Sequence, residues 1–334
     1  YDRNHASVIL RSLTCETGSG ADLEVIRSLY DSAHRLIPGA LVEDDSSWIE
    51  WNRIADFYDD HPYGNNHTWV PTLRRLNEYV GRHAPKPLVL GESISADTWP
   101  RLEALAAKAG SKRPYWFPKS FDAQRQWIDQ MPRSAGPEGL DRLREDSLRY
   151  GLLMRKYQAE TFRREIPDGS YVISVLRDVP IASMGLLDYV GDSKWPASDW
   201  AWQRDTALLL ETDRDRRSVA AGSTLTGRIW ISHFGDHAVR NGRLRVWIDG
   251  VAPDAGARSA PREVTVTLDA GGNRPGLDFA WGSPPLDGVP KRLWVRAVLE
   301  AGDLKVRNAW PIWAIPDPAP ASPEMVFAHS SLAD

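Results

Sequence analysis

Two short apolar segments of the chain each lead directly to a glutamate. Residues 86–93, KPLVLGES, form an apolar run that closes on Gly91 and Glu92. Residues 7–18, SVILRSLTCETG, begin in the same way and reach Glu16. Because a short apolar run predicts a buried strand, a carboxylate at its end marks the point where the chain leaves the core. These two strand ends are the first candidates for chemistry.

Strand-like and helix-like segments alternate from residue 1 to about residue 200. Residues 22–36 carry apolar side chains three or four apart, with Asp22 as a predicted N-cap and Pro38-Gly39 as a stop, which predicts a helix. Further helices are predicted over 71–83, 97–109 and 138–164, and strands near 7–13, 40–44, 54–60, 87–91 and 170–176. Such alternation is typical of a parallel sheet with helices outside it.

The first strand is not followed by a nucleotide-binding loop, because TGSG at 17–20 lacks the G-x-G-x-x-G spacing. Its absence favours a closed (β/α) barrel, in which functional residues lie at the carboxyl ends of the strands. Five strands are predicted, whereas a barrel has eight. We therefore interpret residues 1–204 as the C-terminal portion, strands four to eight, of a (β/α)8 TIM barrel. An upstream portion of the same protein is expected to complete it, since the chain begins at Tyr1 without an initiator Met.

The pattern changes after about residue 205. The segments RIWIS, RLRVWID, EVTVTL and RLWVRAVL alternate apolar and polar residues with a period of two, and turn residues separate them without an intervening helix. This pattern predicts an immunoglobulin-like β-sandwich over residues 205–316. The Pro-rich stretch that follows predicts a tail or linker over 317–334.

Composition narrows the range of partners. A net charge of −4 spread along the chain argues against nucleic acid or an anionic membrane surface as a partner. No apolar stretch approaches the roughly 18 to 20 residues of a transmembrane helix. Cys15 is the single cysteine, so no internal disulfide can form, and no zinc-type Cys/His spacing is present. The compartment stays open, with secreted and periplasmic locations both compatible.

Glu16 and Glu92 are separated by two predicted strands, so in a barrel both would point into one mouth from different walls. Hydrolysis of a glycosidic bond needs such a pair, one carboxylic acid for the leaving oxygen and one carboxylate on the opposite face of the sugar. A separation of about 5 to 5.5 Å leads to a covalent intermediate and retained configuration. From their spacing alone, Glu16 and Glu92 could also be ordinary solvated residues at strand ends without a catalytic role.

Longer segments add a family resemblance. RNHASVILRSLTCETG resembles the R-N-H-P-S-V-x-L-W-S-L-G-N-E segment of glycoside hydrolase family 2, which contains β-galactosidases, β-glucuronidases and β-mannosidases. KPLVLGES is similar to the nucleophile strand of that family, and GSYVISVLRDVPIASMGLLDYVGDSKWP resembles the end of its barrel. The resemblance implies that Glu16 is the general acid/base and Glu92 the nucleophile. It also implies that His61 and Tyr63, in DDHPYG, line the substrate subsite, with Tyr63 near the nucleophile.

The chain departs from the family pattern at several positions. Cys15 replaces the Asn that contacts the sugar, so that contact is weakened or supplied by Asn65 or Asn66. Arg11 replaces a Trp, and the Thr and Glu of the last barrel strand are replaced near Arg177. Substrate identity therefore does not transfer, and a catalytically inactive carbohydrate-binding relative is the alternative.

Further substrate contacts are predicted from position alone. Trp48, Trp51 and Trp69 lie in loops after predicted strands, where a ring could stack on a sugar, although packing is the alternative for each. Asp44, in the acidic run 43–45, lines the same mouth or belongs to a solvated turn. Cys15 as a thiol nucleophile lacks a His partner in the sequence. The prediction is a retaining glycosidase for β-linked sugars such as β-galactosides, with no metal and no cofactor.

Overall fold

The computed structural model describes residues 5–18, 20–64, 67–110, 112–130, 136–200, 202–250, 259–283, 285–286 and 288–316. The chain divides into two compact units, Tyr1–Ala201 and Trp202–Asp334. The predicted tail at 317–334 and the candidate sugar contacts Asn65 and Asn66 lie outside the described residues.

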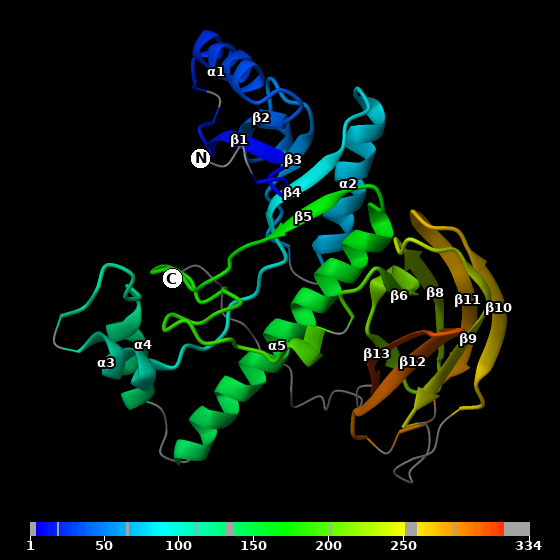
Figure 1. Ribbon diagram of the computed structural model, residues 1–334. Coiled ribbons are helices and arrows are strands. Elements are labelled where there is room, and N and C mark those ends of the chain that lie inside the picture. Colours follow the sequence, from blue (N-terminus) through cyan, green and yellow to red (C-terminus); the bar gives the residue numbers. More distant parts are fainter. Residues whose placement is uncertain are drawn as a thin grey trace, which may run out of the picture. The chain divides into compact units, whose positions relative to one another are not determined.

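In its described residues, unit 1 contains five short strands that pair in parallel (Figure 1). They are β1 (Leu10–Cys15), β2 (Leu41–Ser46), β3 (Tyr58–Asp60), β4 (Leu88–Ser93) and β5 (Ser170–Ile173). β1 pairs with β2, and β3, β4 and β5 form a second sheet in chain order. A bridge between Glu43 and Ala55 links β2 to the segment before β3. Because neighbouring strands are parallel, their carboxyl ends meet at common edges.

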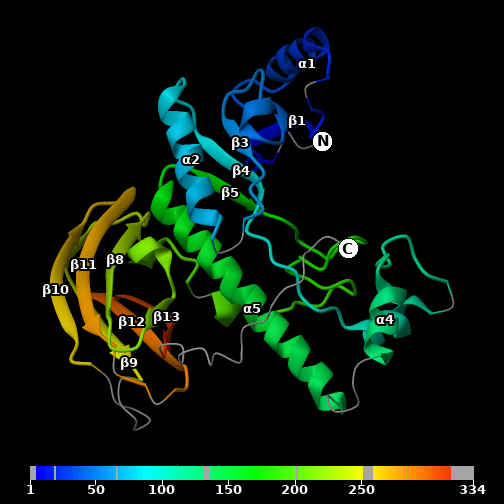
Figure 2. The same cartoon turned by 180° about the vertical axis from the view of Figure 1, so that it is seen from behind.

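Five α-helices accompany these strands in the described part of unit 1. They are α1 (Leu23–Leu36), α2 (Trp69–Arg82), α3 (Leu102–Ala109), α4 (Phe121–Asp129) and α5 (Gly136–Glu165). The predicted N-cap is confirmed, since Asp22 accepts hydrogen bonds from the backbone of Glu24 at 2.8 Å and Val25 at 3.3 Å. α2 packs against the long α5, and the two lie side by side in both views (Figure 2). The sequence pattern had not predicted α4.

The apolar face of α1 is an exception to its prediction. Leu23, Leu29 and Leu36 belong to the apolar spacing that predicted this helix, yet their side chains are 48%, 44% and 66% exposed, whereas Ile26 is buried. The spacing groups the apolar side chains on one face; α1 packs against β2 and buries Ile26, while Leu23, Leu29 and Leu36 of the same face stay exposed. An exposed apolar stripe of this kind is typical of a surface that another segment covers.

Unit 2 consists of two antiparallel-rich sheets that share one apolar core. Its strands are β6 (Thr206–Thr212), β7 (Ser218–Ala220), β8 (Thr224–His233), β9 (Val239–Asp249), β10 (Arg262–Leu268), β11 (Gly272–Gly282), β12 (Lys291–Ala301) and β13 (Leu304–Ile315). One sheet has the order β10-β9-β12-β13-β7 and the other β11-β8-β6. Alternate side chains such as Leu244, Val246 and Ile248 of β9 are buried, as the period of two predicts.

The protein is therefore a sheet-dominated mixture of strands and helices. The closed barrel and the immunoglobulin-like topology stay predictions at this point. Within the described ranges, no helix is both long enough and apolar enough to cross a membrane.

Candidate active site

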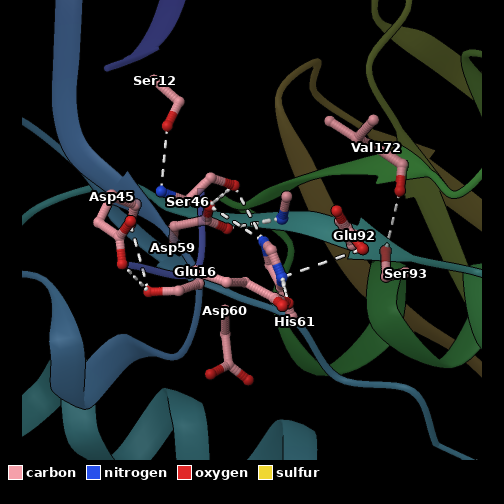
Figure 3. A network of polar contacts seen from close by, with 12 residues as sticks. Ser12, Glu16, Asp45, Ser46, Asp59, Asp60, His61, Glu92, Ser93 and Val172 are labelled. Carbon is pink, nitrogen blue, oxygen red and sulfur yellow. Dashed lines mark hydrogen bonds and ion pairs between the residues drawn. The ribbon is translucent and has the colours of Figure 1, made fainter. Parts of the chain in front are cut away.

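The carboxyl ends of β1 and β4 bring Glu16 and Glu92 together. One carboxylate oxygen of Glu16, one of Glu92 and Nδ1 of His61 all lie within 4.8 Å of one another. Glu16 follows β1 directly, and Glu92 is the second-to-last residue of β4. Their side chains are 41% and 36% exposed, so both carboxylates remain open to solvent and to a substrate. Figure 3 shows them converging on His61.

His61 lies between the two carboxylates, directly after β3. Its buried ring places Nδ1 2.8 Å from Oε1 of Glu16 and 4.0 Å from Oε2 of Glu92. Tyr63, half exposed, donates a short hydrogen bond from its hydroxyl to Oε2 of Glu92. The two residues predicted to line the subsite are thus placed against the two glutamates, one on each.

The opposite side of the His61 ring faces two residues that the sequence had not singled out. Nε2 of His61 lies 2.9 Å from Oγ of Ser46, which donates to Oδ2 of Asp59 at 2.5 Å. The other oxygen of Asp59 accepts the backbone N–H of Gly91 at 2.6 Å. A polar residue inside an otherwise buried strand is the signal that could have indicated Asp59, since such a group needs a partner.

Two acids near this network, Glu43 and Asp60, have pKa values above those of ordinary carboxyl groups. Burial, and after it the nearby charge and hydrogen bond of Asp59, raise the pKa of Glu43 to about 9. Burial raises the pKa of Asp60 to about 6, although its hydrogen bond from the backbone of Ile49 opposes the shift. Burial also raises the pKa of Asp59, against the hydrogen bonds from Ser46 and Gly91. Desolvation of the charged form is therefore the largest cause of the raised pKa of these three acids.

The acidic run 43–45 is buried, and this corrects the prediction that Asp44 contacts sugar or belongs to a solvated turn. The Asp44 side chain has no exposed surface and accepts from Nε of Arg53 at 2.9 Å. Asp45 binds Thr14 and Thr17 instead, and although burial opposes it, these hydrogen bonds lower the pKa of Asp45. Both carboxylates hold the strand ends in place and are not open to a ligand.

The three candidate tryptophans differ in position. Trp48 and Trp51 are 39% and 37% exposed, lie edge to face with ring centroids 4.7 Å apart, and Trp48 is 6.2 Å from the ring of His61. Trp69 is fully buried on α2, and its Nε1 donates to the carbonyl of Gln158 at 3.0 Å. A ring without exposed surface offers no face for stacking, so the predicted sugar contact of Trp69 is wrong and packing is its role.

Cys15 is exposed at the end of β1, beside the two glutamates. Burial of the sulfur, followed by the negative charges of Glu92 and Glu16, raises the pKa of its thiol. Because a thiolate is the reactive form, this environment makes Cys15 a poor nucleophile. It also leaves a weak hydrogen-bond donor where the family pattern has an amide.

Glu16, His61 and Glu92 are the described residues whose donor atoms come closest to a metal-binding arrangement. Nitrogen and oxygen ligands lie about 2.0 to 2.2 Å from zinc, so two ligands of one ion are at most ~4.4 Å apart. The three donor atoms lie within 4.8 Å of one another, close to that limit. Nδ1 of His61 is hydrogen-bonded to Glu16 at 2.8 Å, so an ion bound to that nitrogen would have to replace this contact.

Comparisons with known proteins find relatives in structure alone. No family model matches the chain, and no curated protein matches its sequence. A β-D-mannosidase from Dictyoglomus thermophilum superposes with a TM-score of 0.57 at 15% identity, over 94% of this chain and 39% of the mannosidase. An exo-chitosanase from Amycolatopsis orientalis gives 0.53 at 15% identity, over 92% of this chain and 37% of that enzyme.

These neighbours are glycoside hydrolases. At such low identity the likeness shows that the chain shares their fold. The chain spans less than two fifths of the length of the two enzymes.

Proposed function

We propose that this chain carries the catalytic pair of a retaining β-glycosidase. The observation that carries the proposal is the approach of Glu16 and Glu92 to within 4.8 Å at the ends of two parallel strands. Retaining enzymes hold their carboxyl groups about 5 to 5.5 Å apart, whereas inverting enzymes leave about 6.5 to 9.5 Å for a water molecule. The short separation favours a covalent intermediate.

In the proposed mechanism, an oxygen of Glu92 attacks the anomeric carbon while the bond from that carbon to the leaving oxygen breaks. Glu16 gives its proton to the leaving oxygen. Glu16 then takes a proton from water, whose oxygen displaces Glu92 and frees the sugar. Both glutamates return to their starting states, and no cofactor takes part.

The contacts of each glutamate fit these roles. The Tyr63 hydroxyl bonds to Glu92 and orients the carboxylate that attacks. His61 bonds to Glu16 through Nδ1 and can hold a proton at that contact. Trp48 and Trp51 offer exposed rings beside the site for the face of a sugar. The substrate class that we propose is a β-linked glycoside, with β-galactosides, β-mannosides and β-glucosaminides as the first candidates.

The proposed architecture is a (β/α)8 barrel whose strands four to eight lie in residues 1–204, followed by an immunoglobulin-like sandwich over 205–316. Apolar side chains are exposed in or next to both outer strands of unit 1. Ile9, before β1, is 65% exposed, and Val172 of β5 and Leu176 after it are 52% and 68% exposed. We propose that an upstream segment of the same protein covers these edges. Below, the full-length protein means the chain together with that segment.

The test is hydrolysis of aryl β-glycosides by the full-length protein, followed by NMR of the first product formed. The proposal expects a β-configured sugar before mutarotation sets in. An α-configured first product would contradict the retaining mechanism, and sugar binding without hydrolysis would identify the inactive carbohydrate-binding relative. Glu24→Gln, on the exposed surface of α1, is a control that should hydrolyse as the unaltered protein does.

A further inference from the structure

Asp59 contacts residues that hold both proposed catalytic glutamates: Gly91 next to Glu92, and Ser46, which contacts the His61 ring bonded to Glu16. The Asp59 side chain has no exposed surface. Oδ1 accepts the N–H of Gly91, the residue before Glu92. Oδ2 accepts from Ser46, which contacts the His61 ring that bonds to Glu16. One buried carboxylate therefore connects the end of β4 with the end of β1, as Figure 3 shows.

The glycine in LGES makes this contact possible. A Cβ at position 91 would lie 2.4 Å from Oδ2 and 2.6 Å from Oδ1 of Asp59, and 2.6 Å from Oγ of Ser46. Such distances are far inside van der Waals contact, so any side chain at this position would displace the carboxylate. The absence of a side chain lets Asp59 approach the strand immediately before Glu92 and fix its backbone.

Hydrogen-bond capacity decides where the protons of this network lie. Ser46 has one hydroxyl hydrogen, and it is donated to Asp59. The Ser46 oxygen can then only accept from His61, so Nε2 must carry a hydrogen. Nδ1 consequently meets Glu16 in one of two ways: it accepts from the protonated acid, or it donates as part of an imidazolium. In both cases one transferable proton lies at the contact between His61 and Glu16.

We propose that Asp59 is the positioning residue for both glutamates: it anchors Gly91 ahead of the nucleophile and, through Ser46, fixes the His61 tautomer that keeps a proton at Glu16. The inference rests on the proposed function. It adds an explanation of how a site with several acids supplies one protonated and one ionised carboxylate.

The neighbouring Glu43 supports this role. Asp59 accepts hydrogen bonds from Ser46 and Gly91, which favour its ionised form, whereas burial raises the pKa of Glu43 to about 9, so Glu43 is the member of the pair that keeps a proton. The second oxygen of Glu43 has no hydrogen-bond partner among the described residues, which also disfavours its charged form. The titratable groups that face His61 and its partners are Cys15, Glu16, Glu43, Asp45, Asp59, Asp60, Tyr63 and Glu92.

The test substitutes Asp59→Asn, which keeps the shape of the side chain. The amide oxygen can still accept from Gly91, but the amide nitrogen must donate to Ser46, so the Ser46 hydrogen turns to Nε2 of His61. The ring then carries its hydrogen on Nδ1 and donates it to Glu16, which favours the ionised carboxylate. In the full-length protein we expect kcat to fall about 10²-fold and KM to change little. The basic limb of the pH–rate profile should move to lower pH.

A second measurement is independent of turnover. Heteronuclear NMR of the chain with nitrogen-labelled histidine distinguishes the two imidazole tautomers, and His61→Gln assigns the signal. The proposal expects hydrogen on Nε2 in the unaltered chain and the neutral Nδ1–H form in Asp59→Asn. The matched control is Asp178→Asn, another buried acid of unit 1, whose partners are Lys194 and the backbone of Gly185. In this control the His61 tautomer and the basic limb of the pH–rate profile should stay as in the unaltered protein.

The outcomes separate the two claims. A neutral Nδ1–H tautomer in the unaltered chain would overturn the proposal even if Asp59→Asn failed to fold. An unchanged tautomer and an unchanged basic limb in a folded Asp59→Asn variant would do so as well. If the tautomer shifts as expected while no aryl glycoside is hydrolysed by the unaltered protein, the positioning role of Asp59 stands and the glycosidase proposal fails.

Discussion

The two units of the chain bury different kinds of residue. In unit 2 the buried cluster is apolar and continuous, with Ile229, Leu244, Leu293, Leu299 and Ile312 all fully buried. In unit 1 acidic and basic side chains are buried beside the apolar ones, and apolar side chains are exposed at α1 and at both outer strands. Burial of apolar surface stabilises a fold, whereas burial of charge costs free energy unless the charge is paired.

This difference indicates that the two units have different roles. The sandwich of unit 2 can hold itself together through its core. Unit 1 places groups where a reaction would need them and leaves surface that we propose is covered by another segment. Substitutions should therefore separate cleanly: those in unit 1 change catalysis, and those in unit 2 change stability.

The largest expected effect is that of Glu92→Gln. Loss of the nucleophile should reduce kcat on the order of 10⁴-fold or more, because the covalent intermediate cannot form. Thermal melting should stay within the error of the unaltered protein, since the Glu92 side chain is partly exposed. Aryl glycoside kinetics and a melting curve check both parts. Undiminished hydrolysis would contradict the assignment of Glu92.

Glu16→Gln should depend on the leaving group. For a glycoside with a poor leaving group, loss of the general acid should cost about 10² to 10⁴-fold in kcat. A dinitrophenyl glycoside, whose phenol leaves without a proton, should still form the intermediate at close to the normal rate and then accumulate it. Burst kinetics measure this directly. Equal losses for both leaving groups would argue that Glu16 has a structural role only.

In unit 2, Leu299→Ala should destabilise by about 2 to 5 kcal/mol, because the Leu299 side chain is fully buried in the shared core. The matched control in unit 1 is Leu29→Ala, whose side chain is 44% exposed and should change stability little. Denaturant unfolding gives both values. A loss of activity in a folded Leu299→Ala variant, equal to that of Glu16→Gln, would contradict the different roles of the two units.

Stability around the site should decrease as the pH rises. Glu43 binds its proton more tightly in the folded protein, where its pKa is about 9, than in the unfolded chain, where it is near 4.5. Between these values the folded state holds more protons than the unfolded state, so raising the pH favours unfolding. Glu43→Gln has no proton to lose and should flatten the decline in melting temperature from about pH 5 to pH 9. Glu24→Gln is the exposed control and should leave the slope unchanged.

The smallest effect concerns Cys15. The negative charges of Glu92 and Glu16 contribute to its raised thiol pKa, after burial. Glu92→Gln should therefore lower the thiol pKa, while the effect of burial remains. The rate of alkylation against pH reports this on the single cysteine of the chain and needs no turnover. An unchanged alkylation profile would mean that Glu92 does not face Cys15 in solution.

Local patterns in the sequence predicted much of this arrangement. The helix at 22–36 and its Asp22 cap depend on side chains a few residues apart, and periodicity captures such spacing. The apolar runs ahead of Glu16 and Glu92 likewise have strands at their places in the structure. Side-chain roles that depend on contacts with residues far along the chain were missed or predicted wrongly.

Asp44 and Trp69 show why. Position after a strand suggested that each was accessible, but accessibility depends on what packs on that side, here Arg53 and Gln158. Asp59 was overlooked for the same reason, since its value lies in contacts with Ser46 and Gly91 from two other strands. The sequence shows a glycine at position 91, but only the structure shows the reason for it, which is that a Cβ there would collide with Asp59.

The most direct test of the central claim is to trap the intermediate. The full-length protein would be incubated with fluoro-sugar inactivators of the galacto, manno and gluco series, digested, and mapped by mass spectrometry. The account predicts one sugar on the peptide that contains KPLVLGES, attached to Glu92, and none in Glu92→Gln. A sugar attached elsewhere, or hydrolysis that proceeds without any adduct, would contradict it.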